Sequence, residues 1–449
     1  MNINFGRWFN KNKAEPEEKK DVFTGSDIGF GVGTSFAEYL YNSGYEDLSA
    51  FASMVLYKRA MPFFNAVNMR AEAFSQIPLR IKEKRTGEFI EDHPVMELME
   101  NPNADVSQQE FLEQMASYYD ITGENFTIAT GRINQPPLEL VNIGPQLINF
   151  SNTATKFGIL NVPNDIRVNK IQGGQLSFKA QEFNSNLGLR FINSDEDSEI
   201  WHIRSFNPLR SSNQFRGLSR AQPIWMELQQ YISGNTTNLS NLKRGTRLSM
   251  AWVNASDVPL SDEQWERMQE EAQKYSGDVN AGGTPILDGM DVKTIQQTNR
   301  EMEFKDLQES MLARASSTYR IPLALLLPAT MTMNNLQTSM LQLFDNGILP
   351  LSSRLYNEMT RMLMPRYKNS EGLMFCYNEN DIPALRIRIL ESAKLLSEID
   401  VNTVDEVRNV IGDPALESGG DQVFRNASLI PIGEDFNSTD TDDLTVDDF

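Results

Sequence analysis

The stretch YRIPLALLLPATMTMNN, residues 319–335, decides how the two halves of the chain are connected. Its apolar part is much shorter than the roughly 20 residues that a membrane-crossing helix needs. Pro322 and Pro328 bracket this part, and each disfavours helical backbone at the residue before it. We therefore expect a helix to end near Ile321 and a new one to begin after Asn335. The stretch between them is predicted to be a structured turn with a mobile tip.

Both flanking segments have helical periodicity. In 298–320 the apolar residues fall on one stripe, which predicts an amphipathic helix. The segment 336–383 begins with apolar residues at steps of three and four as far as Leu363 and ends in a strand at GLMFCYN. Gly347 and Pro350 predict a kink in the middle of this long helix.

A further helix is expected upstream, at 219–245. Ser219 is interpreted as its N-cap with Gln222 in the capping-box position, and LKRG as its end. Between the two helices, 246–297 is expected to form a small α/β unit with a helix from Ser261. Two helices that flank a small insert predict a stalk with a cap at its end.

The rest of the chain predicts an α+β fold. Residues 51–218 are expected to form helices, one of them stopped by Gly123, and a β-rich lobe. Residues 384–430 are expected to be helical, with Thr403 and Glu406 as a capping box. Residues 1–50 are interpreted as a flexible arm. The tail, 431–449, is acidic and is interpreted as solvated.

Length, hydropathy, cysteine count and net charge limit the classes of protein to which the chain can belong. With 449 residues the chain is long enough for about two to four domains. No window is apolar enough for a membrane span and the N-terminus does not resemble a secretion signal, so a cytoplasmic protein is expected. The single cysteine, Cys376, is interpreted as a buried structural thiol. A net charge of −20 disfavours tight binding of nucleic acid.

Motifs for catalysis are weak. The chain has only two histidines, His93 and His202, and both are interpreted as structural. RGLSRA imitates a nucleophile elbow, but both histidines precede Ser219, whereas that motif needs its histidine afterwards. GFGVGT lacks the P-loop lysine. The acidic run at 194–199 is interpreted as a solvated turn. No spacing suggests a metal site or a cofactor.

Seven motifs in order resemble the portal proteins of tailed bacteriophages, over about residues 50–433. They are HPVMELMENPN, TGENF, EIWHIRSFN, FRGLSRAQP, STYRIPLALLLP, the ILP kink, and the closing LLSEIDVNTVDEVRNVIGDPAL with GGD and LIPIG. One departure is Asp405, where the family pattern has asparagine. The resemblance implies about twelve copies in a ring around an axial channel, with wing, stem, clip and crown regions.

The resemblance also implies roles for segments of the chain. Residues 51–218 and 336–383 would form the wing, the two predicted helices the stem, 246–297 the clip, 321–335 the turn and tunnel loop, and 384–430 the crown. The loop residues beside DNA would be Pro328, Thr330, Met331, Thr332, Met333, Asn334 and Asn335. Contact with the DNA backbone is expected from Lys243, Arg244 and Arg247, for which pairing with the helix dipole is an equal alternative. Docking of a motor or adaptor is expected at Glu266, Glu270 and Glu271 of the clip.

We therefore expect a non-enzymatic portal without cofactors, located at a capsid vertex of the virion and assembled in the host cytoplasm. Its expected partners are further copies of itself, the major capsid protein, the large terminase subunit, a head-tail adaptor and passing double-stranded DNA, with no membrane. The alternatives are another ring-forming head or tail connector and, less favoured, a hydrolase using the acidic run at 194–199. A helix, small domain and second helix at 219–320 distinguish the portal, because neither alternative requires them.

Overall fold

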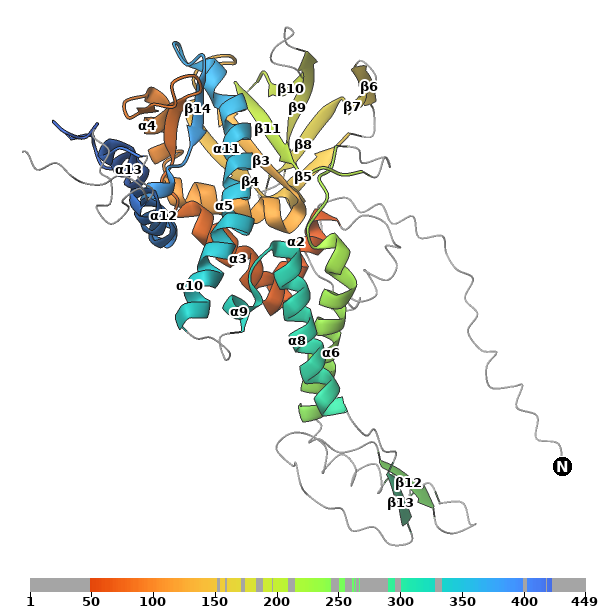
Figure 1. The fold of residues 1–449 in the computed structure, drawn as a ribbon. Helices are drawn as coiled ribbons and strands as arrows, with labels where there is room; N and C mark the ends of the chain where they lie inside the picture. Colours follow the sequence, from red (N-terminus) through yellow and green to blue (C-terminus); the bar gives the residue numbers. More distant parts are fainter. Residues whose placement is uncertain are drawn as a thin grey trace, which may run out of the picture.

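The computed structural model describes residues 49–151, 154–157, 160–170, 174–182, 189–195, 197–208, 215–243, 250–254, 261, 263, 266, 290–294, 300–327, 333–398, 402–416 and 418–421. These residues form a body from which a two-helix stalk extends (Figure 1). The expected arm lies outside the described residues except for its last two positions, where Ser49 caps the first described helix. The expected acidic tail also lies outside them.

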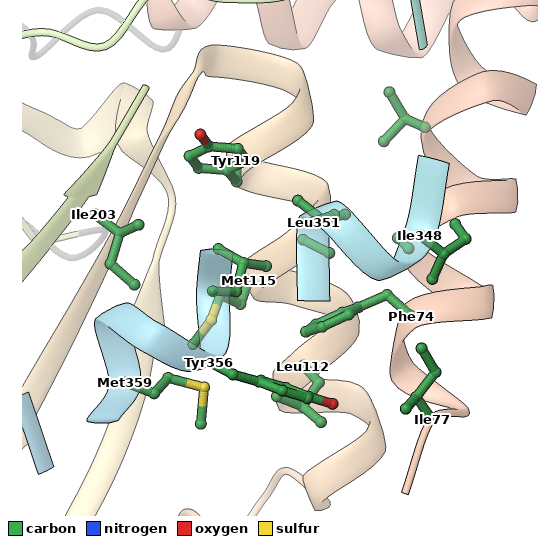
Figure 2. Close-up of a cluster of buried hydrophobic side chains, with 14 of the residues drawn as sticks. Phe74, Ile77, Leu112, Met115, Tyr119, Ile203, Ile348, Leu351, Tyr356 and Met359 are labelled. Carbon is green, nitrogen blue, oxygen red and sulfur yellow. The ribbon is translucent and has the colours of Figure 1, made fainter. Parts of the chain in front are cut away.

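The body is centred on helices that bury their apolar stripes against one another. They are α2 (Ala50–Arg59), α3 (Met61–Ser75), α4 (Pro94–Glu100), α5 (Gln108–Thr122) and α11 (Leu349–Leu363). Figure 2 shows α11 facing α3 and α5, with Leu351, Tyr356 and Met359 of α11 beside Phe74 and Leu112. Spacings of three and four residues place such side chains on one face of a helix. This contact joins the C-terminal half of the chain to its N-terminal half.

Beside the helices lies an antiparallel sheet with the strand order β4-β3-β11-β10-β9-β8-β5. Its strands are β3 (Glu124–Thr130), β4 (Glu139–Ile143), β5 (Ile148–Phe150), β8 (Asp165–Asn169), β9 (Gln175–Glu182), β10 (Leu189–Asn193) and β11 (Ser198–Arg204). One of its faces holds a separate apolar core that includes Phe126, Phe178 and Phe191. The expected β-rich lobe is therefore confirmed.

The remaining described strands form three smaller sheets. The sheet β14-β1-β2 joins β14 (Leu373–Cys376), β1 (Arg80–Glu83) and β2 (Phe89–Ile90). Two pairs, β6 (Ala154–Phe157) with β7 (Leu160–Pro163) and β12 (Met250–Asn254) with β13 (Met290–Thr294), stand apart from it. The strand expected at GLMFCYN is thus confirmed, and Cys376 is buried in it as expected.

The stalk consists of α6 (Trp225–Lys243) and α8 (Arg300–Tyr319), which run side by side away from the body, with β12 and β13 beyond their far end (Figure 1). At 1.5 Å per residue each helix is about 30 Å long. The prediction that α6 begins at Ser219 is wrong. The Ser219 hydroxyl donates to the Ile121 carbonyl at 2.6 Å and accepts from the Ala221 amide, and a 3₁₀ turn, Gln222–Ile224, precedes α6.

After α8 the chain turns as expected. Tyr319 ends the helix, α9 (Leu323–Leu326) is a single turn, and α10 (Met333–Gln342) leads through a π-helical turn, Leu343–Ile348, into α11. The break expected at Gly347 and Pro350 takes the form of this π-helical turn, which accommodates one extra residue per turn without ending the helix.

The C-terminal helices are α12 (Arg386–Glu398) and α13 (Val404–Ile411), which lie against each other at the flank of the body (Figure 1). The capping box of Thr403 and Glu406 is confirmed, and Gly412 ends α13 with a left-handed φ of 91°. Asp405 accepts a hydrogen bond from the Leu416 amide at 2.9 Å, which an asparagine oxygen could equally accept. The departure from the family pattern therefore leaves the local structure intact.

Substitutions of Tyr356 test the packing of α11 against α3 and α5. Tyr356 is 1 % exposed, and its hydroxyl has no hydrogen-bond partner among the residues that the structure describes. We expect Tyr356→Phe to raise the free energy of unfolding by about 1 kcal/mol, because it removes a buried polar group that is unsatisfied. Tyr356→Ala should lower it by about 3–5 kcal/mol by leaving a cavity. Urea unfolding followed by circular dichroism measures both, and a destabilised phenylalanine variant would contradict the prediction.

Candidate functional site

The residues expected to line a channel are only partly described. Pro328, Thr330, Met331 and Thr332 lie outside the described residues. Met333, Asn334 and Asn335 form the first turn of α10 rather than part of a loop, so the expected loop is shorter than predicted. The Asn335 side chain is exposed.

Of the residues expected to contact DNA or to dock a motor, the structure also describes only some. Lys243 is the last residue of α6, whereas Arg244 and Arg247 lie outside the described residues. Glu266 is helical and exposed, and Glu270 and Glu271 lie outside the described residues. What the structure describes fully is the place where the stalk joins the body. We call it the stalk root and define it by six residues: Arg70, Asp120, Glu124, Arg216, Arg220 and Tyr319.

Two carboxylates at the end of α5 hold the segment that leads into α6. Glu124 lies four positions after Asp120 in the chain, and Arg220 lies four positions after Arg216. Arg220 Nε lies 3.3 Å from Asp120 Oδ1, and Arg216 donates to Glu124 Oε1 at 2.5 Å. Both carboxylate side chains are at most 2 % exposed. The contact of Arg216 with Glu124 is a charge-assisted hydrogen bond, which is stronger than a neutral one, and that of Arg220 with Asp120 is an ion pair; together they fix the start of the stalk at the end of α5.

The returning end of the stalk is fixed to the same helix. Arg70 of α3 donates to Asp120 Oδ2 at 2.7 Å and to the Tyr319 carbonyl at 2.5 Å. The Tyr319 hydroxyl donates to the Asp120 carbonyl at 3.0 Å. All three side chains are buried. Burial lowers the pKa of Arg70, and it raises the pKa of Tyr319 well above its ordinary value. Asp120 thus contacts both ends of the stalk.

The turn after Tyr319 is packed against the π-helical turn. Arg320 has a left-handed φ of 55°, which is uncommon for a residue other than glycine. A Cβ on Gly347 would lie 3.1 Å from the Arg320 carbonyl oxygen, closer than ordinary packing allows. Glycine at 347 therefore lets the backbone of the long helix approach the end of the stalk.

Glu124 is the centre of a second buried group. It accepts from His202 Nε2 at 3.1 Å and from the Gly217 amide at 3.2 Å, in addition to Arg216. Burial alone would raise the pKa of Glu124, but the His202 hydrogen bond and the Arg216 charge outweigh it, so the pKa is lowered. Burial lowers the pKa of His202, which stacks on Phe126 at 4.3 Å. Glu124 is therefore a carboxylate and His202 a neutral donor.

Two glycines allow this arrangement. Gly123 has a φ of 79°, and a Cβ on it would lie 2.2 Å from the Leu218 carbonyl oxygen. A Cβ on Gly217 would lie 2.1 Å from the Gly123 carbonyl oxygen. The TGENF and FRGLS motifs are therefore in backbone contact. A cavity of about 280 Å³ lies beside them, and its charged lining residues, Glu124 and Arg216, bond each other.

The acidic run at 194–199 is not a catalytic pair. Asp195 and Asp197 are exposed, but Glu199 is buried, so the interpretation of the whole run as solvated was wrong. Trp201 and Arg366 bond the Glu199 carboxylate, and the guanidinium of Arg366 lies 4.9 Å from the centre of the Trp201 ring. Glu199 is the second residue of β11, an inner strand of the sheet between β3 and β10, in which the first four residues are all buried. Glu199 joins this strand to the end of α11.

The remaining candidate groups are structural. His93 caps α4, where its Nδ1 accepts from the Val95 amide at 3.2 Å. Among the described residues no group of three or more His, Cys, Asp or Glu side chains could hold a metal ion. Within the same part of the chain, no helix combines the length and apolar character that crossing a membrane requires.

Comparison with known proteins identifies the family. The family model described as phage portal protein matches residues 62–412. The chain belongs to the phage portal protein family. Portal proteins are structural and not enzymatic, which agrees with the expected absence of catalysis. An uncharacterised protein of Rickettsia bellii is 22 % identical over 81 % of this chain and 89 % of its own length. One of Rickettsia felis is 24 % identical over the same shares.

Two solved structures have a similar fold. A chain from the neck of an empty GTA particle, computed with C6 symmetry, aligns with a TM-score of 0.59 and 20 % identity, covering 81 % of this chain and 94 % of that one. A chain from the neck of a native GTA particle, computed with C12 symmetry, gives 0.57 and 19 % identity, covering 85 % and 99 %. At this identity the likeness concerns the fold alone. The fold is mixed helix and sheet, as expected.

The stalk root of this portal family member was missed by sequence reasoning, although a signal was present. Arg70 lies in the buried stripe of α3, between Val67 and Phe74. Asp120 likewise lies in the buried stripe of α5. A charged residue at a position that periodicity predicts to be buried requires a partner, because an unpaired charge is costly to bury. Periodicity alone does not say where that partner lies in the chain.

The buried ion pair gives a stability prediction. We expect Asp120→Ala to lower the free energy of unfolding by about 3–5 kcal/mol, because it leaves Arg70 buried without its partner. The matched control is Glu358→Ala, which breaks the exposed pair with Arg361 and should change stability by at most about 0.5 kcal/mol. Urea unfolding measures both. Equal effects of the two variants would contradict the prediction.

His202 gives a pH prediction. Its pKa is lower in the folded chain than in the unfolded chain, so below about pH 6.5 the unfolded state binds a proton that the folded state does not. Stability should therefore fall as the pH decreases from 6.5, by up to about 1.4 kcal/mol per pH unit. In His202→Gln this contribution is absent, so the decrease from pH 7.0 to 5.5 should be smaller. Urea midpoints at the two pH values measure it, and equal decreases would refute it.

Proposed function

We propose that the chain is the portal subunit of a tailed-phage-like particle, and that its copies form a ring at one capsid vertex. Double-stranded DNA would be packaged and ejected through the channel of this ring. The observation that carries the proposal is the two-helix stalk, which buried ion pairs fix to α5, in a chain that belongs to the portal family. Because both stalk helices are fixed where they meet the body, the stalk can transmit force from its far tip to the body.

The proposed regions follow the order of the elements. The body, with 51–218 and 336–383, is the wing. The helices α6 and α8 are the stem, and the segment 246–297 between them is the clip. The turn after α8, with the segment up to α10, forms the tunnel loop. Residues 384–430 form the crown. The order of described helices and strands along the chain supports this division.

The charge of the chain supports a channel through which DNA slides. Residues 228–242 of α6 include no charged side chain, and the whole chain has a net charge of −20. Affinity for DNA comes mainly from basic residues that neutralise phosphates. Walls that are neutral or acidic would leave the duplex free to move, with Lys243, Arg244 and Arg247 as the candidates for limited backbone contact.

The proposed partners follow from the same role. Further copies, the major capsid protein, the large terminase subunit and a head-tail adaptor would contact the ring, which would be built in the host cytoplasm and remain in the virion. The similar fold from a neck computed with C12 symmetry supports a ring of twelve. The energy for DNA movement would come from the terminase, because the family is not enzymatic.

Electron microscopy of the purified protein tests the proposal directly. We expect rings with a channel at least about 20 Å wide, wide enough for duplex DNA, in negative stain, and a matching mass in native mass spectrometry. The protein should be examined at several concentrations and with capsid protein added, because assembly depends on concentration. A monodisperse small particle under every condition would refute the ring.

The clip gives a second prediction. We expect charge reversal to lysine at three positions to weaken binding of the terminase ATPase by about tenfold or more, because like charge replaces the proposed attraction. The positions are Glu266, Glu270 and Glu271. The matched control neutralises three basic residues at the end of the stem to glutamine and should leave ATPase binding unchanged while altering the amount of packaged DNA. They are Lys243, Arg244 and Arg247. Unimpaired ATPase binding after the reversal would place docking elsewhere.

A further inference from the structure

The outward side of α3 exposes apolar and polar side chains on one stripe. Its residues recur at steps of three and four, and they are Met61, Phe64, Asn65, Asn68 and Glu72. Met61 and Phe64 are 56 % and 42 % exposed. Tyr57 of α2 borders the stripe, because its ring centre lies 5.1 Å from that of Phe64 and its hydroxyl donates to Asn68 Oδ1 at 2.5 Å. The stripe is thus apolar at one end and acidic at the other.

Two carboxylates of α5 enlarge the acidic end of this stripe. Burial raises the pKa of Glu113, and the charges of Glu72 and Glu110 raise it further, so the charges that act on this carboxyl are negative. Such like charges are unfavourable in an isolated subunit. Lys58 and Arg59 of α2 are exposed too, but at about 100° per residue they lie on other sides of that helix than the tyrosine that borders the stripe. We call this side of the body the α3 surface and define it by Tyr57, Met61, Phe64, Glu72, Glu110 and Glu113.

A basic surface lies where α11 meets β11. Arg354 and Arg361 are exposed on α11, and Arg204 is the exposed last residue of β11. Arg354 donates to the Arg204 carbonyl at 2.9 Å. Burial lowers the pKa of Arg204; among the nearby charges, Glu124 and Glu358 raise it and Arg361 lowers it. Glu124 is buried at the stalk root, whereas Glu358 belongs to this surface and is paired with Arg361 at 2.6 Å. Three guanidinium groups beside one carboxylate leave the surface positive.

An exposed phenylalanine borders these arginines. Phe206 is 79 % exposed and lies two residues after Arg204. Its neighbour is held in place, because the Ser205 amide donates to the Gly123 carbonyl at 2.7 Å and the Ser205 hydroxyl donates to the Leu218 carbonyl at 2.6 Å. Aromatic residues and arginine are enriched in protein–protein interfaces relative to the rest of the surface. We call this side the α11 surface and define it by Arg204, Phe206, Arg354, Glu358 and Arg361.

The two surfaces lie on different sides of α5. The guanidinium of Arg354 lies 5.4 Å from the centre of the Tyr119 ring, near the end of α5. At about 100° per residue, Glu113 and Glu110 are turned by about 120° and about 180° from Tyr119 around the axis of α5. Figure 1 shows α5 running across the direction of the stalk. Both surfaces therefore border one helix at the same end of the stalk, and they face away from each other.

We propose that the α3 surface of one copy of this chain packs against the α11 surface of a second copy. Each surface gathers like charges, and the charges of the two surfaces are opposite, so contact between copies neutralises both. Nucleic acid bound to the arginines would leave the α3 surface uncovered, whereas a second copy covers both. Because two different surfaces meet, the contact is heterologous, and repeating it generates a ring when the rotation closes. This inference rests on the proposed ring and adds which surfaces join its subunits.

Charge reversal tests the contact. We expect Glu72→Lys with Glu113→Lys to raise the concentration at which half of the subunits are in rings by about tenfold or more, because like charges then face each other. Arg354→Glu with Arg361→Glu should have the same effect. A chain with all four substitutions should recover most of the lost assembly, since the attraction is restored with the signs exchanged. Native mass spectrometry and negative stain over a dilution series measure these proteins.

The matched control is Glu91→Lys with Glu371→Lys, which makes the same change of charge at exposed carboxylates outside both surfaces. The control should assemble like the unmodified chain, and circular dichroism should show which proteins are folded. The variant of the α3 surface leaves the hydrogen bond of Arg354 to the Arg204 carbonyl in place. It therefore decides the test by itself if the variant of the α11 surface does not fold.

The outcomes separate the contact from the proposed function. Rings of the unmodified chain together with unimpaired assembly of the α3-surface variant would overturn the contact and leave the portal function standing. Loss of assembly without recovery in the folded fourfold variant would overturn the pairing of these two surfaces, and so would an equal loss in the control. Absence of rings from the unmodified chain under every condition would refute the proposed function itself.

Cross-linking identifies the partner surface. Cys376 is the only cysteine, so in a Cys376→Ala background a single new cysteine can be placed on either surface. Asn357 is exposed on α11 between Arg354 and Arg361 and suits the α11 surface. We expect a bismaleimide to join two copies when Glu72→Cys and Asn357→Cys proteins are mixed, and neither protein to be joined to itself. Cross-linking of either protein alone would indicate a symmetric contact and overturn the inference, as would absence of cross-links under conditions that give rings.

Discussion

The buried pair of Arg70 and Asp120 is the interaction on which the rest of the structure depends. Its two side chains are 1 % and 0 % exposed, so both ions lose their hydration on folding. Such pairs contribute little net stability compared with apolar packing, because desolvation offsets most of the attraction. What this pair adds is a constraint on how the helices are arranged. Arg70 can satisfy Asp120 and the Tyr319 carbonyl together only when α3, α5 and the end of α8 lie in one arrangement.

The same helix α5 holds the other end of the stalk. The spacing of Asp120 and Glu124 places one carboxylate on the last full turn of α5 and the other just after Gly123. Arg220 and Arg216 meet them in the reverse order, so the segment before α6 runs antiparallel to the end of α5. Removing Arg70 or Asp120 would leave the other as a buried charge without its partner. The two stalk helices are thereby tied to one element rather than to each other alone.

The sequence predicted the elements better than it predicted their contacts. Periodicity located α8, α10 and α11, and capping residues located the ends of α5 and α13, because these signals are local. The start of α6 was predicted wrongly. Ser219 has the residue type of an N-cap, but its hydroxyl donates to the Ile121 carbonyl, 98 residues away in the chain. Arg70 and Asp120 lie 50 residues apart, and spacing within a helix shows only that each is buried. Pairing across such distances depends on tertiary packing.

The stalk root and the C-terminal helices differ in one physical respect. Every charged group of the root finds its main partner within the same chain, so the junction closes without a second subunit. The C-terminal helices are less completely covered, because Leu390 and Leu395 of α12 are 46 % and 61 % exposed and no residue of α13 is fully buried. A subunit built like this can fold first and associate afterwards. Association through other surfaces would not disturb the junction that orients the stalk, because the buried charges of that junction are paired within the chain.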